Sequence, residues 1–400
     1  MVHKIPIFAA ISPSASTDVY VPVMNCEISI NTTTEANAET PFFEDGTMSN
    51  MAVSIWTNSA AGVSNVYFRK NGADGNMTVS IPAGTTGRFY DTTNTDTVTN
   101  GDVCCWRVDR GGAVQLGFVG GYYETDSGTI VNKIGVFGTA SFATGTGYMA
   151  FIGNPADAIT DGLADQCPTI NVACEAKAMW AYASSNGRSN TTDFSDRINA
   201  GAGSLSVTFP ASTAGLQTDT GTTTIAVGDE YNFKRVTNTG SGTFVLQMVG
   251  VDLHYPANEF QLFSANMGGV SYNATTARYA IPAGCHAAGG SLSLSSIKLY
   301  GTGKVKDLYL YIPTNAGTVA QIWAAIIGGS VSSLTTTSGI SATGLFSDTT
   351  NEPTFADGND LSLRYLKSSG SGATTLRFLT MTIEFDVPVN DNYPQTVFMG

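Results

Sequence analysis

The feature that most constrains this 400-residue chain is a long internal repeat. The stretch "MTVSIPAGTTGRFYDTTNTDTVTNGD" (77–102) has a clear counterpart in "LSVTFPASTAGLQTDTGTTTIAVGDE" (205–230) and a weaker one in "LTTTSGISATGLFSDTTNEPTFADGND" (334–360). Matching residues in the three copies lie 128 and 129 positions apart: Gly87, Gly215 and Gly344, and Asp91, Asp219 and Asp348. Solenoids and propellers repeat every 20 to 50 residues or so, so this much longer period indicates tandem domains.

The repeat extends upstream and divides the chain into three units. Asn58, Asn186 and Asn315 each end an apolar run before a turn, again 128 and 129 residues apart. The predicted units are 1–130, 131–257 and 258–400, the third with a C-terminal tail. They are joined without Pro-rich or Gly/Ser linkers, so we expect neighbouring domains with restricted relative motion.

Each unit reads as a set of short strands. Alternating runs such as "MAVSIW", "NMTVSI", "SLSVTF" and "DLYLYI" are separated by Gly, Asn, Asp and Pro, a pattern typical of strands and turns. About eight strands fit into one unit, which predicts an all-β protein of three tandem jelly-roll-like antiparallel β-sandwich domains. The one candidate for a helix is a turn or two in 154–166.

Composition excludes several classes of protein. The net charge of −13 and pI near 4.5 argue against nucleic-acid binding, which relies on clustered Lys and Arg. The most apolar segment, 319–331, is too short for a membrane span and contains Gly328 and Gly329. The N-terminus superficially resembles a signal peptide, but Pro6 breaks its apolar region and "KIPIF" at 4–8 is echoed by "KIGVF" at 133–137, so we interpret it as mature structure.

The repeated Gly and Asp residues are interpreted as turn formers. Pro82 and Pro210 end strands, Gly87 and Gly215 allow positive φ, and the Asp side chains can accept local backbone hydrogen bonds. The alternative is a calcium site, because "NGADGN" (71–76) and "FADGND" (355–360) alternate carboxylates and amides. Neither segment has the complete EF-hand pattern.

No catalytic, cofactor or metal site is predicted. The histidines, His3, His254 and His286, fall in different units away from any nucleophile motif, and no glycine-rich phosphate loop occurs. The six cysteines lack CxxC spacing. We interpret them as free, partly buried thiols, with a Cys167–Cys174 disulfide left open.

Aromatic residues are the other candidates for contact. Trp56, Trp106, Trp180 and Trp323 lie in predicted strands, and the adjacent pair Tyr122 and Tyr123 closes the first unit. Successive strand residues point to opposite faces, so one tyrosine of the pair must face away from its own core. We expect core, domain-interface or subunit-interface packing, with glycan binding as the alternative.

The stretch "FRKNGADGNMTVSIPAGTTGRFYDTTNTDTVTNGD" (68–102) resembles the repeated β-sandwich modules of bacteriophage structural proteins of the tail-fibre, baseplate and head-decoration types. The match is closest in the first unit, partial in the second and faint in the third. This resemblance implies an oligomeric virion surface component, assembled in the host cytoplasm. The units could then form a stalk or a pseudo-threefold cap.

Three classes of function follow from these expectations. A noncatalytic virion structural protein, a capsid-decoration or tail-appendage component, comes first. A carbohydrate-binding adhesin or receptor-binding fibre is second, and an enzyme that degrades surface polysaccharide is third. We expect other virion proteins of the capsid or tail as partners, a homo-oligomer with a trimer as one candidate, and host surface glycan in the second case. The candidate contact residues are Arg69, Lys70, Asn71, Asp74, Trp56, Trp106, Tyr122 and Tyr123.

Overall fold

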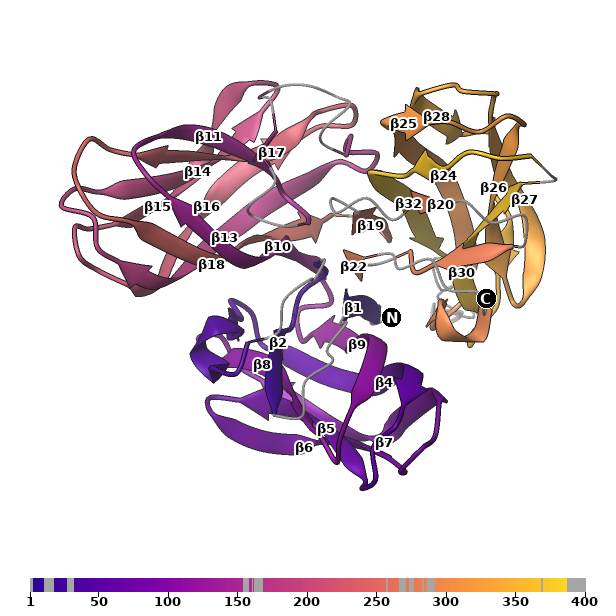
Figure 1. Ribbon diagram of the computed structural model, residues 1–400, viewed down its shortest axis with the longest axis horizontal. Coiled ribbons are helices and arrows are strands. Elements are labelled where there is room, and N and C mark those ends of the chain that lie inside the picture. The colour runs from indigo at the N-terminus through magenta and orange to yellow at the C-terminus, as the bar shows by residue number, and fades with distance from the viewer. Residues whose placement is uncertain are drawn as a thin grey trace, which may run out of the picture.

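The chain folds into three antiparallel β-sandwiches arranged around a common centre, as the computed structural model shows (Figure 1). The structure describes residues 3–10, 18–26, 32–153, 158–159, 161, 168–256, 258–265, 271–272, 277–282, 284–285, 292–367 and 370–386. The segment 154–166, expected to contain a helical turn, lies mostly outside these residues, and its described part includes the short strand β12 (Ala158–Ile159). The expected C-terminal tail beyond Asp386 also lies outside the described residues.

Sandwich 1 consists of a four-stranded and a five-stranded sheet. One has the order β1 (Ile5–Ala10), β9 (Val114–Thr125), β4 (Gly46–Asn58), β7 (Gly87–Val98). The other has the order β2 (Val19–Pro22), β8 (Val103–Asp109), β5 (Ser64–Lys70), β6 (Ala73–Ile81), with β3 (Thr40–Pro41) also beside β8. A short 3-10 turn, η1 (Glu35–Asn37), lies between β2 and β3.

Sandwich 2 repeats this arrangement. Its first sheet has the order β10 (Ile130–Phe142), β18 (Phe244–Tyr255), β13 (Cys174–Asn186), β16 (Gly215–Ile225). Its second sheet has the order β12, β11 (Gly145–Ala150), β17 (Tyr231–Thr237), β14 (Thr192–Ile198), β15 (Gly201–Phe209).

Sandwich 3 has the same arrangement of two main sheets and adds several short strands. Its first sheet has the order β22 (Gly284–Cys285), β19 (Glu259–Ala265), β32 (Phe378–Phe385), β24 (Gly303–Ile312), β28 (Gly344–Asp348), with β29 (Thr354–Phe355) on β24. Its second sheet has the order β21 (Arg278–Ala280), β30 (Asp360–Lys367), β26 (Gln321–Ile327), β27 (Ser330–Ser338), with β23 (Ile297–Lys298) on β30. A small sheet joins β20 (Ser271–Tyr272), β31 (Thr374–Thr375) and β25 (Thr314–Asn315), and η2 (Leu292–Leu294) is a 3-10 turn.

The strand order defines the fold as a jelly roll. When the eight principal strands of each sandwich are numbered in chain order, one sheet reads 1-8-3-6 and the other 2-7-4-5, and this holds in all three sandwiches. Two four-stranded antiparallel sheets wound in this way form the double Greek key of a jelly roll. The expectation of an all-β protein with three tandem jelly-roll sandwiches is therefore confirmed.

Alternation of side chains explains why these segments form strands. In β6, Met77, Val79 and Ile81 are buried while Thr78 and Ser80 are exposed, and β15 repeats the pattern. Such a period of two places one face on the core and the other in solvent. Gly87, Gly215 and Gly344 begin the sixth strand of each sandwich at φ between 99° and 126°, a conformation that favours glycine.

Candidate functional site: the junctions between the sandwiches

The "RKNGADGN" hairpin lies between β5 and β6, and its charged side chains are used within sandwich 1. Arg69 is largely buried, with Nε 2.6 Å from Glu35 Oε1 and Nη1 paired with Asp74. Asp74 also accepts a hydrogen bond of 2.9 Å from Arg107 Nη1. The side-chain hydrogen bond with Glu35, followed by that with Asp74, raises the pKa of Arg69.

The remaining hairpin residues differ in availability. Asn71 has φ of 50°, donates to Asp102 Oδ1 at 2.7 Å and accepts from the Val103 N–H at 3.0 Å, so it holds a turn. Lys70 donates to the Thr97 carbonyl at 2.8 Å, yet its side chain is 37% exposed. Of the four hairpin candidates, Arg69 is therefore the buried one, while Lys70 is partly exposed and Asn71 and Asp74 are exposed.

The aromatic candidates are mostly buried. Trp106 is fully buried and packs on Phe68 in the core of sandwich 1. Tyr123 is buried against Phe42, and Trp56, partly exposed, lies over Gly117. Trp106, Tyr122 and Tyr123 are therefore buried within this chain, and their contact with another protein stays a prediction.

Tyr122 has a different role, between sandwiches. Its hydroxyl donates to the Lys298 carbonyl at 2.5 Å, and its ring meets Tyr300 edge-on with centroids 4.7 Å apart. Tyr122 and Tyr123 therefore point to opposite faces, and the prediction that one of them packs at a domain interface is confirmed.

The three repeated asparagines perform one identical task. Asn58 Nδ2 donates to the carbonyls of Pro82 and Thr85 at 3.0 and 2.9 Å, and its Oδ1 accepts from the Ala60 N–H. Asn186 and Asn315 make the same three bonds at the equivalent positions. Each side chain thus clamps the loop between the fifth and sixth strands onto the end of the third.

The repeated aspartates bind backbone N–H groups at the edge of a sheet. Oδ2 of Asp91, Asp219 and Asp348 accepts the backbone N–H of Thr78, Ser206 and Thr335 respectively, at 2.7 to 3.0 Å. These donors lie on the fifth strand, at the edge of its sheet, so the carboxylates occupy groups that another chain could otherwise pair with. The turn interpretation of the repeat is confirmed by these bonds.

The carboxylates of the two candidate calcium segments also have partners within the chain. Asp74 faces two arginines, and Asp357 accepts the Gly301 N–H at 2.8 Å. The described residues hold no group of three or more His, Cys, Asp or Glu side chains able to bind a metal ion. Among these residues there is also no helix long and apolar enough to cross a membrane.

The junction of sandwiches 1 and 2 contains a buried ion pair. Lys133 Nζ lies 2.7 Å from Asp252 Oδ2 and donates to the Pro41 carbonyl of sandwich 1 at 3.0 Å. The ammonium also lies 4.4 Å from the centroid of the Phe42 ring and 5.1 Å from that of Trp180. Burial lowers the pKa of Lys133 and raises that of Asp252, while each charge favours ionisation of the other.

A chain of amides links all three sandwiches at the centre. Asn25 Nδ2 donates to Asn132 Oδ1 at 2.7 Å, and Asn132 Nδ2 donates to the Gln261 carbonyl at 2.9 Å. All three residues are fully buried. Buried amides need partners, so this chain fixes the first strands of sandwiches 2 and 3 relative to sandwich 1. Gln261 then bonds to Thr169 and Asn171, which extends the contact between sandwiches 2 and 3.

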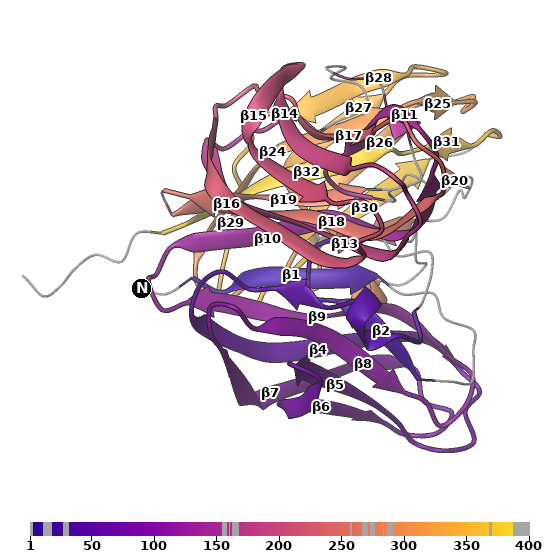
Figure 2. The same ribbon diagram turned by 90° about the vertical axis from the view of Figure 1, so that its left-hand side faces the viewer.

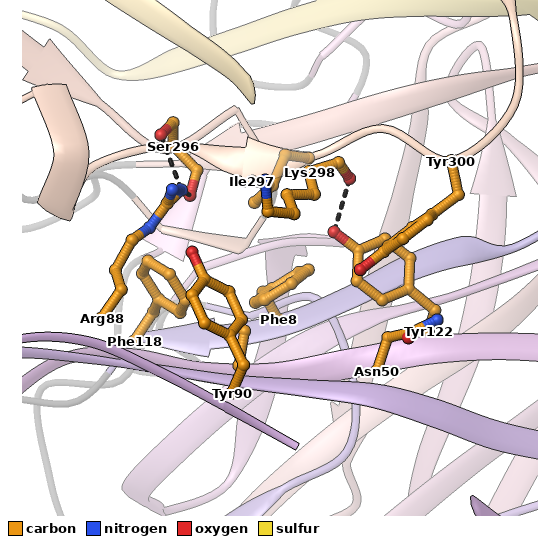
Figure 3. Close-up of a pocket in the computed structure, with 11 residues that line it drawn as sticks. Phe8, Asn50, Arg88, Tyr90, Phe118, Tyr122, Ser296, Ile297, Lys298 and Tyr300 are labelled. Atoms are coloured by element: carbon orange, nitrogen blue, oxygen red, sulfur yellow. Dashed lines mark hydrogen bonds between the residues drawn. The ribbon is translucent and has the colours of Figure 1, made fainter. Parts of the chain in front are cut away.

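The junction of sandwiches 3 and 1 returns to the first sheet of sandwich 1 (Figure 3). Arg88 donates to Asp360 Oδ1 at 2.9 Å and to the Ser296 carbonyl at 2.6 Å. Ser54 Oγ adds a bond to the Leu294 carbonyl. The cavity that remains between the two surfaces is about 10 Å³, space for about one water molecule.

These junctions form a closed cycle. In each case the connection between the second and third strands of one sandwich packs on the 1-8-3-6 sheet of another. Residues 25 and 41–43 of sandwich 1 meet sandwich 2, residues 169–171 of sandwich 2 meet sandwich 3, and residues 294–300 of sandwich 3 meet sandwich 1. The three sandwiches of one chain are thus arranged in a closed, pseudo-threefold way and not in a line.

A groove of about 460 Å³ opens beside the junction of sandwiches 1 and 2. It lies at one end of the first sheet of sandwich 2 and is lined by Cys174, Glu175, Lys177, His254 and Tyr255 among others. His254 Nδ1 is 3.3 Å from Glu44 Oε1 of sandwich 1. Burial, with Lys133 and Lys177 nearby, lowers the pKa of His254 to about 4, so it is neutral at pH 7.

Cys104, Cys105 and Cys174 are free, buried thiols, as expected, and Cys26 is buried as well. The Cys167–Cys174 disulfide left open by the sequence involves Cys167, which lies outside the described residues, and Cys174 is a free thiol where described. Burial raises the pKa of Cys174 to about 12. This thiol stays protonated at neutral pH, which makes it a poor nucleophile.

Comparison with known proteins gives no family. No protein-family model matches, and no curated protein matches in sequence. Similar solved structures include one described as the triple jelly-roll fold and turret assembly of an archaeal virus, at 14% identity over 95% of this chain and 91% of that chain, with a TM-score of 0.19. Sulfolobus turreted icosahedral virus gives 16% identity, 95% and 92% coverage and 0.19, and the Gx strain of infectious bursal disease virus gives 7%, 97% and 82% coverage and 0.20. At these TM-scores the fold rests on strand pairing, which defines the chain as a triple jelly-roll protein.

Proposed function

We propose that this chain is a noncatalytic structural protein of a virion, either an exterior capsid decoration or a tail appendage, which assembles with other virion proteins. The observation that carries the proposal is the closed cycle of three jelly rolls. Jelly rolls build viral capsids as well as lectins. Buried polar contacts at all three junctions make one stiff block of the chain, which suits a particle component. The likeness of residues 68–102 to bacteriophage modules points the same way.

The carboxylates that a hydrolase would need have structural partners, which supports a noncatalytic role. Asp91 and Asp219 hold strand edges, and Asp102 and Asp229 accept hydrogen bonds from the turns that contain Thr99 and Ala226. General acid or base catalysis requires a carboxyl group free to reach a substrate. These four side chains instead stabilise the strand edges and turns that the repeat encodes.

The test is to look for the chain in particles. Virions purified by density gradient from an infected host would be analysed by mass spectrometry, and antibodies to the chain would be used for immunogold electron microscopy. We expect the protein in stoichiometric amounts on the particle exterior. A nonstructural viral protein serves as the control and should be absent from the same particles. Absence of the chain from purified virions would overturn the proposal.

The groove in sandwich 2 favours one second candidate, a glycan-binding role on the host surface. Its volume lies within the range of small-ligand sites, and Glu175 and Lys177 offer an acceptor and a donor that are 43% and 37% exposed. A glycan array with the wild type, Lys177→Ala and the control Lys304→Ala tests it. Binding lost only in Lys177→Ala would support the candidate, and a wild type that binds no glycan would remove it.

A further inference from the structure

Lys133 and Asp252 are closed off from solvent more completely than any comparable pair in the described part of the chain. Both side chains are 1% exposed, whereas every other lysine–carboxylate ion pair among the described residues includes a side chain at least 30% exposed. The rings of Phe42, Phe43 and Trp180 have centroids 4.4 to 5.5 Å from Lys133 Nζ. The two charges therefore face each other in a mostly apolar environment.

The two groups are also close enough to react. Lys133 Nζ lies 2.8 Å from Asp252 Oδ1 and 2.7 Å from Oδ2. Since a carboxyl C–O bond is about 1.23 Å long, these two distances place Nζ no more than about 3.1 Å from Cγ. Reacting atoms held about 3–3.5 Å apart form a near-attack arrangement, in which the entropy of bringing them together has already been lost. A turn of the carboxyl group about its Cβ–Cγ bond presents one face of Cγ to the amine.

Burial favours the uncharged forms that a reaction between these groups needs. It lowers the pKa of Lys133 and raises that of Asp252, and the charge of the nearby Glu44 raises the pKa of Asp252 further. A proton that moves along the hydrogen bond from Nζ to Oδ2 turns the ion pair into an amine and a carboxylic acid. The uncharged amine has the lone pair of a nucleophile, which the ammonium lacks.

We propose that Lys133 and Asp252 condense into an intramolecular amide bond. The Nζ lone pair attacks Cγ and forms the new bond, while the bond from Cγ to the protonated oxygen breaks. The departing hydroxyl takes one proton from Nζ and leaves as water, so no oxidant, reductant or further reactant is needed. The N–H that remains on Nζ keeps its acceptor, the Pro41 carbonyl at 3.0 Å. A neutral amide thus replaces two buried charges, whose removal from water is costly.

The amide joins the first and last principal strands of sandwich 2. Lys133 lies on β10, where the chain enters from sandwich 1, and Asp252 lies opposite it on β18, where the chain leaves for sandwich 3. Figure 2 shows β10 and β18 side by side above the strands of sandwich 1. The bond closes the chain between these residues into a ring, which lowers the entropy of the unfolded chain and so stabilises the folded one. The inference does not depend on the virion proposal.

The experiment is electrospray mass spectrometry of the intact, denatured chain during storage at pH 7 over days. Condensation releases one water molecule, so the reacted chain is lighter than its sequence by that mass. Lys133→Arg is the test variant, because a guanidinium keeps the charge opposite Asp252 but stays protonated and does not attack. Lys306→Arg is the matched control, because Lys306 Nζ also lies 2.7 Å from a carboxylate, that of Glu384, but in contact with solvent.

We expect a species lighter by one water molecule in the wild type and in Lys306→Arg, with a share that grows during storage, and none in Lys133→Arg. Proteolytic digestion of the wild type should release a branched peptide that joins the segments around Lys133 and Asp252, a result that does not depend on whether a variant folds. A wild type that keeps its full mass throughout rules out condensation, and so does a loss of water that persists in Lys133→Arg. Unreacted chains keep the ion pair, so the mass also identifies the form that enters an unfolding experiment.

Discussion

Lys133 and Asp252 lie directly opposite each other on β10 and β18, with Nζ 2.7 Å from Oδ2 and both side chains about 1% exposed. The pair belongs to sandwich 2, but the remaining bond of Lys133 goes to the Pro41 carbonyl in sandwich 1. A charge buried inside one domain thus becomes a specific contact with the next. Removing either partner leaves the other charged and buried, which is costly.

Lys133→Met is expected to destabilise the protein by about 3–5 kcal/mol, because Asp252 keeps no compensating charge. Asp252→Leu should cost a similar amount. The double variant should recover much of the loss, since neither charge is then buried alone. Urea unfolding of the wild type, the two single variants and the double variant gives the four free energies of a double-mutant cycle. Additive losses in the double variant would show that the pair does not act as a unit.

Asn186→Ala is expected to lower the free energy of unfolding by about 1–3 kcal/mol, because the Pro210 and Thr213 carbonyls lose their donor and the Arg188 N–H its acceptor. Asn186→Asp keeps the acceptor and removes both donors, so it should remain destabilising. Thermal unfolding measures both variants. Wild-type stability in Asn186→Ala would contradict the clamp.

Asp91 should make the free energy of unfolding depend on pH in the acidic range. Burial opposes its ionisation, but hydrogen bonds from Asn94, Thr78 and Thr93 together outweigh burial and lower its pKa to about 2. An unfolded Asp titrates near 3.9 or so, so the contribution of Asp91 is complete above about pH 4 and is lost as the pH falls toward about 2.

Asp91→Asn should therefore be less stable than the wild type at neutral pH, and the difference should shrink as the pH falls from about 4 to about 2. Melting temperatures of the two proteins across this range provide the measurement. If the gap stayed constant with pH, the stabilising ionised form of Asp91 would be ruled out.

Arg88→Met tests the junction of sandwiches 3 and 1. The variant loses the bonds to Ser296 and Asp360, so backbone amides in 294–300 should exchange hydrogen faster than in the wild type. Arg235→Met is the matched control, because this guanidinium lies 3.8 Å from the Phe142 ring centroid within sandwich 2. Equal exchange in 294–300 for both variants would contradict the assigned junction.

The sequence predicts the individual sandwiches well because their signals are local. Alternating apolar residues mark strands such as β6, and the repeated Gly87, Asp91 and Asn58 act within one turn or one neighbouring strand. Their spacing in the chain therefore carries the information.

The sequence does not predict how the sandwiches pack, because no local pattern pairs the residues that meet there. Asn132 and Gln261 lie 129 residues apart, at the spacing of the repeat, but neither residue indicates its partner in the sequence, and the chain that joins them to Asn25 forms only once the three domains are placed. The burial of Tyr122 is similar: alternation shows that it leaves its own core, but only the position of Tyr300 shows what covers it. The sequence therefore does not show which aromatic side chains are covered within the chain.

Closure of the three sandwiches into one block is the central claim, and small-angle X-ray scattering tests it most directly. A low protein concentration keeps the measurement on the monomer. A compact chain of this length has a radius of gyration of about 21 Å, and the closed cycle predicts a value near this. Three sandwiches in a line would give a value of roughly 30 Å by the same scaling for each domain, and such a result would contradict the account.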